Sequence, residues 1–189
     1  MKSLTIEQIE EVLEKGFEDF KSSVLVETGT YEGGTVFNCY EFFSKIYTIE
    51  LNKKVLETTI NKSKQMGIDN VNFYNGQSQD LLPLIINQEL NLIGPCIFFL
   101  DAHYTHNDYG LTSRGDIDVP LIQEVEIICK NFKHQCIIII DDADAMGNTN
   151  INETAQADWS NINHDGVLNA IGNRKNTWHY FDSKNGKRR

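Results

Sequence analysis

Acidic residues end four short apolar runs that are typical of β-strands. They are Glu27, Glu50, Asp101 and the pair Asp141-Asp142, at the ends of the runs 24–26, 45–49, 96–100 and 136–140. Carboxylates accept hydrogen bonds from hydroxyl and ammonium groups and bind hard cations. If the runs are strands of one parallel sheet, their carboxyl ends lie at one edge, where such sheets bind ligands. The sequence therefore predicts one acidic ligand site.

A glycine-rich turn follows the first run. It reads Glu27-Thr28-Gly29-Thr30-Tyr31-Glu32-Gly33-Gly34-Thr35. Gly29 permits a tight turn, and Gly33 or Gly34 permits close approach of backbone and helix to a ligand. A dinucleotide-binding turn needs a second glycine where Tyr31 stands, which disfavours NAD. The acid Glu27 also suits a ligand that carries ammonium and sulfonium charges better than it suits a diphosphate.

Glu50 ends the second run about twenty residues downstream, a spacing at which a carboxylate accepts both hydroxyl hydrogens of a ribose. Each feature alone is also typical of an ordinary loop or a solvated strand end. Together with the turn, in a strand-helix-strand context, Glu50 predicts a site for a nucleoside that carries positive charge.

The pattern Glu-x-Gly-x-x-x-Gly-x-Thr, with an acid at the end of the second run, resembles class I S-adenosylmethionine-dependent methyltransferases. The resemblance implies that the turn and its acid hold the methionine part, Glu50 the ribose, and Gly76-Gln77-Ser78 the adenine. Gln77 stands where an acid is more usual. The implied cofactor-binding residues are Glu27, Gly29, Thr30, Tyr31, Gly33, Thr35, Glu50, Gln77, Ser78 and Asp101.

The other two strand ends indicate a metal site. Converging carboxylates favour Mg²⁺, with Mn²⁺ and Ca²⁺ as alternatives. The segments 98–104, 115–121 and 140–143 are similar to macrocin-type O-methyltransferases, which implies that Asp101, Asp141 and Asp142 ligate the metal. The metal would lower the pKa of a substrate hydroxyl, and Asp101 or His103 would take its proton. Histidines in polar loops are also often merely solvated.

Alternating strand and helix patterns must position these acids. They predict an α/β fold, Rossmann-like and doubly wound, with a mostly parallel sheet of about seven strands and helices on both faces. We expect one domain over residues 1–189, with an N-terminal helix at about 5–21, a polar surface loop at 147–163 and a last strand at 177–181.

The composition of the chain limits the classes of molecule that it is expected to bind. The chain has 189 residues and a formal net charge of −10, which disfavours nucleic acid and anionic membranes. Four cysteines without a paired motif indicate neither zinc nor disulfides. We expect a cytoplasmic protein without a signal peptide or membrane span; a homo-oligomer is left open.

The leading hypothesis is an O-methyltransferase that acts on a small hydroxylated molecule or a sugar. One alternative is a non-catalytic module that binds S-adenosylmethionine. A weaker alternative is a nicotinamide oxidoreductase. The only Tyr-x-x-x-Lys pattern in the sequence, Tyr180 to Lys184, lies at the end of the chain, far in sequence from the strand ends that would hold a nicotinamide.

Overall fold

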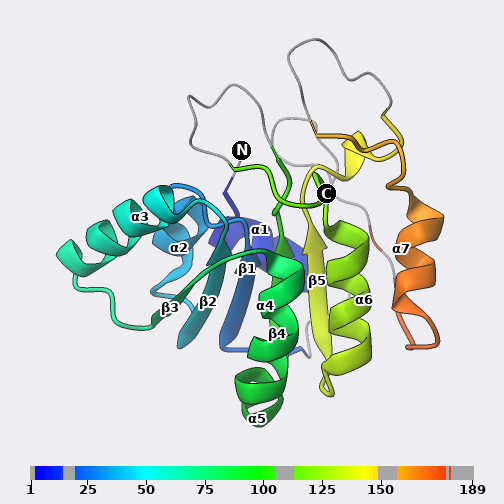
Figure 1. The fold of residues 1–189 in the computed structure, drawn as a ribbon. Coiled ribbons are helices and arrows are strands. Elements are labelled where there is room, and N and C mark those ends of the chain that lie inside the picture. The colour runs from blue at the N-terminus through cyan, green and yellow to red at the C-terminus, as the bar shows by residue number, and fades with distance from the viewer. Residues whose placement is uncertain (1–2, 15–19, 105–112, 149–156, 178, 180–189) are drawn as a thin grey trace.

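A five-stranded parallel sheet lies at the centre of the part of the chain that the structure describes (Figure 1). The structure is a computed structural model and describes residues 3–14, 20–104, 113–148, 157–177 and 179. The strands are β1 (Val24–Thr28), β2 (Lys45–Glu50), β3 (Val71–Asn75), β4 (Cys96–Leu100) and β5 (Cys136–Ile140), in the order β3-β2-β1-β4-β5. Both faces of β1 and β4 are covered, so every residue of these two strands is buried, and apolar residues follow one another without a break over 24–26 and 96–100.

The strand order reverses beside β1. Leu25 of β1 pairs with Ile46 of β2 on one side and with Ile97 of β4 on the other. The chain therefore leaves the sheet in opposite directions at the carboxyl ends of β1 and β4, and this switch point is where open α/β sheets bind ligands. The expected neighbourhood of the fourth and fifth strands is confirmed, since Leu100 pairs with Ile140.

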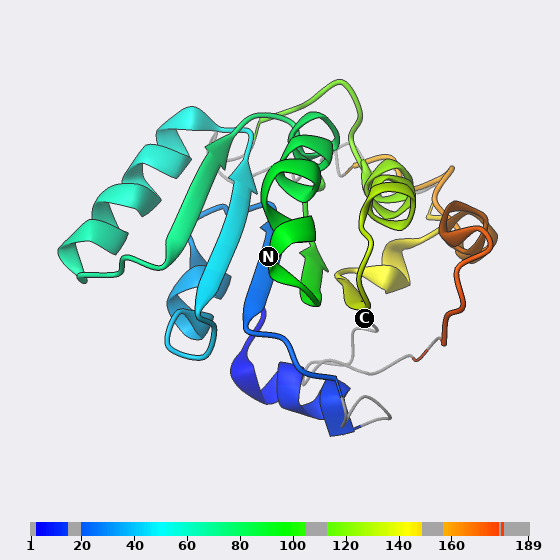
Figure 2. The same ribbon diagram turned by 90° about the horizontal axis from the view of Figure 1, so that it is seen from below.

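Helices cover both faces of the sheet. They are α1 (Ile6–Glu14), α2 (Gly34–Cys39), α3 (Lys53–Gln65), α4 (Ser78–Ile85), the π-helix η1 (Ile86–Leu90), α5 (Asn91–Ile93), α6 (Leu121–Asn131), the 3₁₀-helix η2 (Ala143–Ala145) and α7 (His164–Ile171). Figure 2 shows α1 and α2 on one side of the sheet and α4 and α6 on the other. Successive strand residues point to opposite faces, so Leu25 packs in the core under α1 and α2, and Val26 in the core under α4 and α6. The predicted Rossmann-like α/β architecture is confirmed.

The prediction of about seven strands is wrong for the described residues, which form five. Of the last predicted strand, Thr177 and His179 are not in a strand, and residues 178 and 180–181 lie outside the described residues. Just before it, the Arg174 guanidinium donates hydrogen bonds to the carbonyls of Phe132 and His134 and ties the chain to the α6–β5 loop. A short aromatic run has β-propensity but needs a ladder partner to become a strand.

The N-terminal helix is shorter than the predicted range 5–21. Residues 15–19 lie outside the described residues, and residues 20–21 are not helical. The connection to β1 is fixed instead by Ser22, whose hydroxyl donates to the Pro95 carbonyl at 2.7 Å. Within the described ranges, every helix is too short or too polar to traverse a lipid bilayer.

The predicted surface loop at 147–163 is partly core. Ala157, Trp159 and Ile162 are buried, and the Gly147 amide donates to the carbonyls of Trp159 and Ile162. Asparagine is the most frequent residue of the segment, but its buried apolar residues belong to the core cluster that includes Leu121 of α6 and Val167 of α7. Residues 149–156 lie outside the described residues.

Candidate functional site

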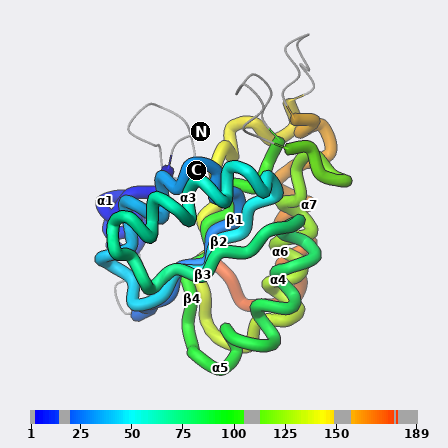
Figure 3. Tube along the Cα trace, turned by 60° about the vertical axis from the view of Figure 1, so that its left-hand side comes forward, coloured from blue at the N-terminus to red at the C-terminus, as the bar shows by residue number. Residues whose placement is uncertain are grey.

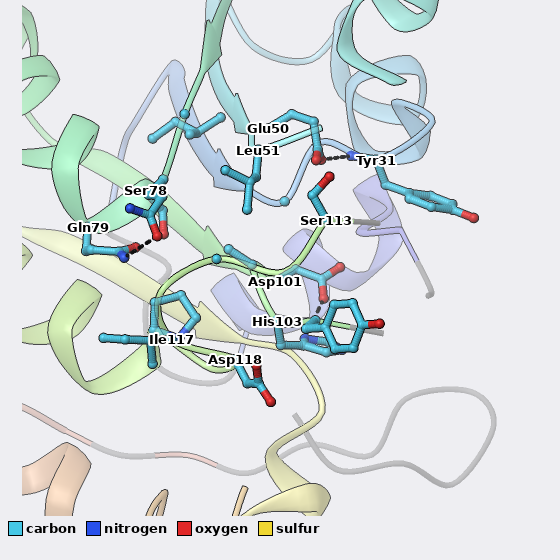
Figure 4. A pocket seen from close by; sticks show the side chains of 18 residues that line it. Tyr31, Glu50, Leu51, Ser78, Gln79, Asp101, His103, Ser113, Ile117 and Asp118 are labelled. Atoms are coloured by element: carbon cyan, nitrogen blue, oxygen red, sulfur yellow. Dashed lines mark hydrogen bonds and ion pairs between the residues drawn. The ribbon is translucent and has the colours of Figure 1, made fainter. Parts of the chain in front are cut away.

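A cavity opens at the switch point, at the carboxyl ends of β1, β2 and β4 (Figure 4). The cavity and its open mouth together have a volume of about 580 Å³. Seven of the predicted site residues line it: Gly29, Tyr31, Glu50, Gln77, Ser78, Asp101 and His103. Glu27, Thr30, Gly33 and Thr35 are buried and do not belong to its lining.

The carboxylate of Glu50 is fixed by backbone amides at the end of β2. Its Oε2 accepts a hydrogen bond from the Tyr31 amide at 2.8 Å, and its Oε1 accepts one from the Asn52 amide at 2.7 Å. A carboxylate offers about four acceptor positions in all, more than these two amides need. The side chain is 8% exposed and lines the cavity, so it is pre-oriented to accept two further donors such as the hydroxyls of a ribose.

The backbone amides of the glycine turn already donate hydrogen bonds within the protein. Gly29 and Thr30 donate to the Ile49 carbonyl at 2.9 and 3.1 Å, Tyr31 donates to Glu50, and Gly33 donates to the Thr30 carbonyl at 2.8 Å. A turn that cradles a pyrophosphate presents such amides to the ligand instead. These four amides are therefore not available to a diphosphate, which supports the sequence argument against a dinucleotide.

Gly29 brings the turn against β4. Its φ is +85°, and a Cβ at this position would lie 2.4 Å from the carbonyl oxygen of Asp101. Only glycine combines this left-handed backbone with so close an approach. Gly29 thus sets the spacing between the turn and Asp101 on which the cavity depends. Tyr31 also has a positive φ, of +47°, although it is not a glycine. The hydrogen bond from its amide to Glu50 holds it in this conformation.

Glu27 lies beneath the turn and is 2% exposed. Its Oε2 accepts a hydrogen bond from the Thr48 hydroxyl at 2.7 Å, and Thr48 Oγ1 also lies 2.6 Å from Thr30 Oγ1. Burial raises the pKa of Glu27 to about 8, against the lowering effect of the Thr48 and Thr35 hydroxyls. The carboxyl is therefore poised to ionise when a positive ligand arrives.

The threonines of the motif support Glu27 from within the protein. The Thr35 hydroxyl accepts a hydrogen bond from the Leu4 amide at 3.1 Å and interacts with Glu27, so it links the N-terminal segment to the acid. Thr30 bonds to Thr48 through its hydroxyl. The sequence resemblance implied cofactor contacts for Thr30 and Thr35; the structure directs both hydroxyls to protein groups.

Removing the Thr48 hydroxyl tests this support. In Thr48→Val the Glu27 carboxyl loses its closest donor, and we expect the free energy of unfolding at pH 8 to fall by about 1–2 kcal/mol. Urea denaturation of the ligand-free protein measures the change. Thr58→Val on the exposed side of α3 removes a hydroxyl that bonds only to the carbonyl one turn before it, at Lys54, and serves as the control. Equal stability of the two variants would show that Glu27 does not depend on Thr48.

Asp101 and His103 lie together at the end of β4. His103 Nδ1 lies 3.4 Å from Asp101 Oδ1 (Figure 4), and its Nε2 lies 3.5 Å from Asp142 Oδ2. The imidazole ring packs edge-on against Trp159, with ring centroids 5.3 Å apart. Burial, followed by the charges of Asp141, Glu27 and Asp142, raises the pKa of Asp101 well above its usual value. Both side chains can therefore hold or accept a proton beside the cavity.

This arrangement does not fit the predicted metal site. The His103 ring lies between the carboxylates of Asp101 and Asp142, where a shared metal ion would need direct access to both. Across the described ranges, no group of three or more His, Cys, Asp or Glu side chains is arranged to hold a metal ion. Mg²⁺ at Asp101, Asp141 and Asp142 is therefore not supported.

Gln77 holds a loop in place. Its Oε1 accepts a hydrogen bond from the Asp116 amide at 2.8 Å, and its Nε2 donates to Asp116 Oδ2 at 2.9 Å and to Asp80 Oδ2 at 3.1 Å. The neighbouring Ser78 is 4% exposed, and its hydroxyl has no hydrogen-bond partner among the described residues. Gln79, the next residue, also lines the cavity, and its Nε2 donates to Gln77 Oε1 at 3.2 Å.

The loop held by Gln77 supplies lining residues that the motif analysis did not identify. Arg114 donates to Asp118 through two nitrogens at 2.6 Å, and this pair shapes the loop. The further lining residues are Ile49, Leu51, Gly76, Gln79, Ala102, Tyr104, Ser113, Gly115, Ile117, Asp118 and Pro120, of which Ser113, Gly115, Ile117 and Asp118 belong to this loop. Leu51 stands directly after Glu50, so its place next to the acid was the signal that could have identified it.

Solved structures share the fold. The O-methyltransferase TomG from Streptomyces achromogenes, involved in tomaymycin synthesis and solved with S-adenosylmethionine, is 14% identical, with a TM-score of 0.59 over 98% of this chain and 78% of its own. Cofactor-bound Rv0187 from MTB is 14% identical, with a TM-score of 0.61 over the same shares. A geranyl diphosphate methyltransferase solved with S-adenosylmethionine is 13% identical, with a TM-score of 0.53 over 87% of this chain and 62% of its own. At these identities the likeness establishes the fold.

The sequence itself has no counterpart in the other two comparisons. No family model matches the chain, and no curated protein matches it.

Proposed function

We propose that the chain is an S-adenosylmethionine-dependent methyltransferase that methylates a hydroxyl group of a small molecule or a sugar. The observation that carries the proposal is the pair of acids at the switch point. Glu50 presents a backbone-fixed carboxylate to the cavity, and Glu27 is buried under the same turn. One ligand that carries both a ribose and an ammonium group matches both acids.

The state of the turn supports this ligand over a dinucleotide. Four backbone amides of the turn donate hydrogen bonds within the protein and are not directed at a phosphate position. Acidic side chains lie around Asp101 at the cavity. TomG and the geranyl diphosphate methyltransferase, which share the fold, were solved with S-adenosylmethionine. The nicotinamide oxidoreductase therefore has the least support of the three hypotheses.

The residues of the site would align the two reactants and remove one proton from the acceptor hydroxyl. S-adenosylmethionine supplies a methyl group on a positively charged sulfur, and its carbon–sulfur bond breaks as the new carbon–oxygen bond forms. The acceptor hydroxyl loses its proton to His103 or Asp101, which lie at the cavity wall. His103 stays oriented because carboxylates lie near both of its ring nitrogens. Alignment and proton removal are the main contributions that such a displacement requires.

The acceptor and the metal are the finer parts of the proposal. The strand-end motifs at 98–104 and 140–143 support the macrocin-type branch and hence a sugar hydroxyl. We derive no step through Mg²⁺, because His103 lies between two of the three carboxylates. The alternative of a non-catalytic binding module shares the cofactor site but gives Asp101 and His103 no role.

Calorimetric titration tests the proposed function. We expect S-adenosylhomocysteine to bind with a Kd of about 10 μM or tighter, and NADH to give no heat. An absence of heat with S-adenosylhomocysteine would refute the proposal. Titration with Mn²⁺ tests the metal: we expect no binding tighter than about 1 mM. Tighter binding that Asp101→Asn abolishes would restore the predicted metal site.

A further inference from the structure

One short loop contacts two walls of the cavity. It comprises residues 113–118, which we call the strap, and it lies at the carboxyl ends of the strands, just before α6 (Figures 1 and 3). Four residues of the strap line the cavity: Ser113, Gly115, Ile117 and Asp118 (Figure 4). A ligand that occupies the cavity therefore lies against the strap.

Two hydrogen bonds join the strap to Gln77, at the wall that follows β3. The Asp116 amide donates to Gln77 Oε1 at 2.8 Å, and Gln77 Nε2 donates to Asp116 Oδ2 at 2.9 Å. We call this pair of bonds the clasp. The strap approaches this wall closely, because a Cβ at Gly115 would lie 2.9 Å from Gln77 Oε1 and 3.4 Å from Leu51 Cδ2.

The strap is also attached at the wall that follows β4. The Tyr104 amide donates to the Asp118 carbonyl at 2.8 Å. The Arg114 guanidinium, which is bonded to the Asp118 carboxylate, lies over the Tyr104 ring at 5.1 Å from its centroid. Tyr104 directly follows His103, the proposed proton acceptor. The strap thus connects the end of β3 to the end of β4.

The clasp is the end of the strap that can open. Asp116 is exposed, whereas Val119, directly after the strap, is 2% exposed and belongs to the core. A hydrogen bond that faces solvent is exchanged for bonds to water, so each bond of the clasp favours the closed strap by only about two- to tenfold. Segments with exposed hydrogen bonds open locally while the rest of the protein stays folded.

We propose that Gln77 is a positioning residue whose clasp holds the strap closed and thereby sets the rates at which the cofactor enters and leaves the site. The inference rests on the proposed function, since it assumes a ligand that lies between Glu50 and Asp101. Both polar atoms of the Gln77 side chain bond to protein groups, so the clasp stabilises the closed strap equally with and without ligand. Loss of the clasp therefore raises the open fraction in both states, and association and dissociation accelerate together.

Stopped-flow mixing with S-adenosylhomocysteine measures both rate constants. Tryptophan fluorescence supplies the signal, because Trp159 packs against His103 beside the cavity. In Gln77→Ala both bonds of the clasp are lost, and we expect both rate constants to rise by about tenfold while the Kd stays within about threefold of the wild type. Asp116→Ala keeps the bond from its own amide and should raise both rate constants by less. Gln65→Ala, the same substitution at an exposed position of α3, should leave them unchanged.

A paired substitution separates the clasp from a direct contact with adenine. In Gln77→Glu the new carboxylate faces Asp116 and Asp80, so the clasp is lost and both rate constants should rise. Adding Asp116→Asn supplies an amide that can donate to this carboxylate, and both rate constants should return to within about threefold of the wild type. If residue 77 instead accepted the amino group of adenine, Gln77→Glu alone would lower the Kd, and Asp116→Asn would have no further effect.

The outcomes separate this inference from the proposed function. Rate constants that rise together in Gln77→Ala and return in the paired variant support the clasp. Rate constants within about threefold of the wild type in Gln77→Ala, or a Kd that rises without faster association, would overturn the clasp and leave the proposed function standing. Absence of S-adenosylhomocysteine binding to the wild-type protein would overturn both.

Discussion

Glu50→Gln is expected to weaken the binding of S-adenosylhomocysteine by about 100-fold or more. Two charge-assisted hydrogen bonds to the ribose are at stake, each of about 1.5–3 kcal/mol, and each 1.4 kcal/mol corresponds to a factor of ten. The amide also creates a conflict inside the protein. Both carboxylate oxygens accept backbone amides, from Tyr31 and Asn52. An NH₂ group in either place would face another donor, so the side chain must turn away from one of them.

Calorimetry with the purified variant measures this loss. Glu57→Gln is the matched control, because Glu57 is an exposed acid on α3 that faces Lys53 at 4.0 Å. We expect its affinity to equal that of the wild type. A Glu50→Gln variant that binds within about threefold of the wild type would mean that the ribose lies elsewhere and would remove the main support for the proposed function.

Glu27→Gln is expected to stabilise the ligand-free protein at pH 8 while weakening ligand binding. The pKa of Glu27 rises from an ordinary 4.5 to about 8, with burial as the first cause. The folded state thus holds this proton more tightly than the unfolded state. The contribution of Glu27 to stability therefore falls as the pH rises from about 4.5 to about 8.

Glutamine removes this dependence, because it stays neutral at every pH. We expect the variant and the wild type to be similar at pH 5 and the variant to be more stable at pH 8 by about 1–3 kcal/mol, less than the full shift because the amide disturbs the bond with Thr35. Urea denaturation at both pH values measures the difference. A difference that does not change with pH would contradict the raised pKa of Glu27.

The same variant should lose at least about tenfold in affinity for S-adenosylhomocysteine at pH 8, because the ammonium group loses its buried counter-charge. A buried acid such as Glu27 lowers the stability of the ligand-free protein and favours the complex, because the ligand supplies the positive charge that the acid lacks. Glu57→Gln again provides the control for both measurements.

The strands and the acids at their ends were predictable from sequence because local pattern determines both. Short apolar runs between turn residues identify buried strands, and parallel strands bring their ends to one edge. The prediction that β4 and β5 are neighbours also holds. The strand count was less predictable, because residues such as Thr177 form a strand only if a partner edge accepts them.

The directions of the site side chains depended on contacts between distant segments. Thr30 turns to Thr48, and Gln77 turns to Asp116 on a later loop, so neither direction is written in the local motif. His103 lies between two carboxylates that the sequence assigned to a metal. The motif identified which residues gather at the site, while tertiary packing decided which atoms face the cavity.

A crystal structure of the protein with S-adenosylhomocysteine tests the central claim most directly. We expect both ribose hydroxyls within about 3 Å of the Glu50 oxygens, and the ammonium group of the ligand on the side of Glu27 and Asp101. The base should lie beside Leu51. A ligand bound away from Glu50, or one whose ammonium group points away from the buried acids, would contradict the account.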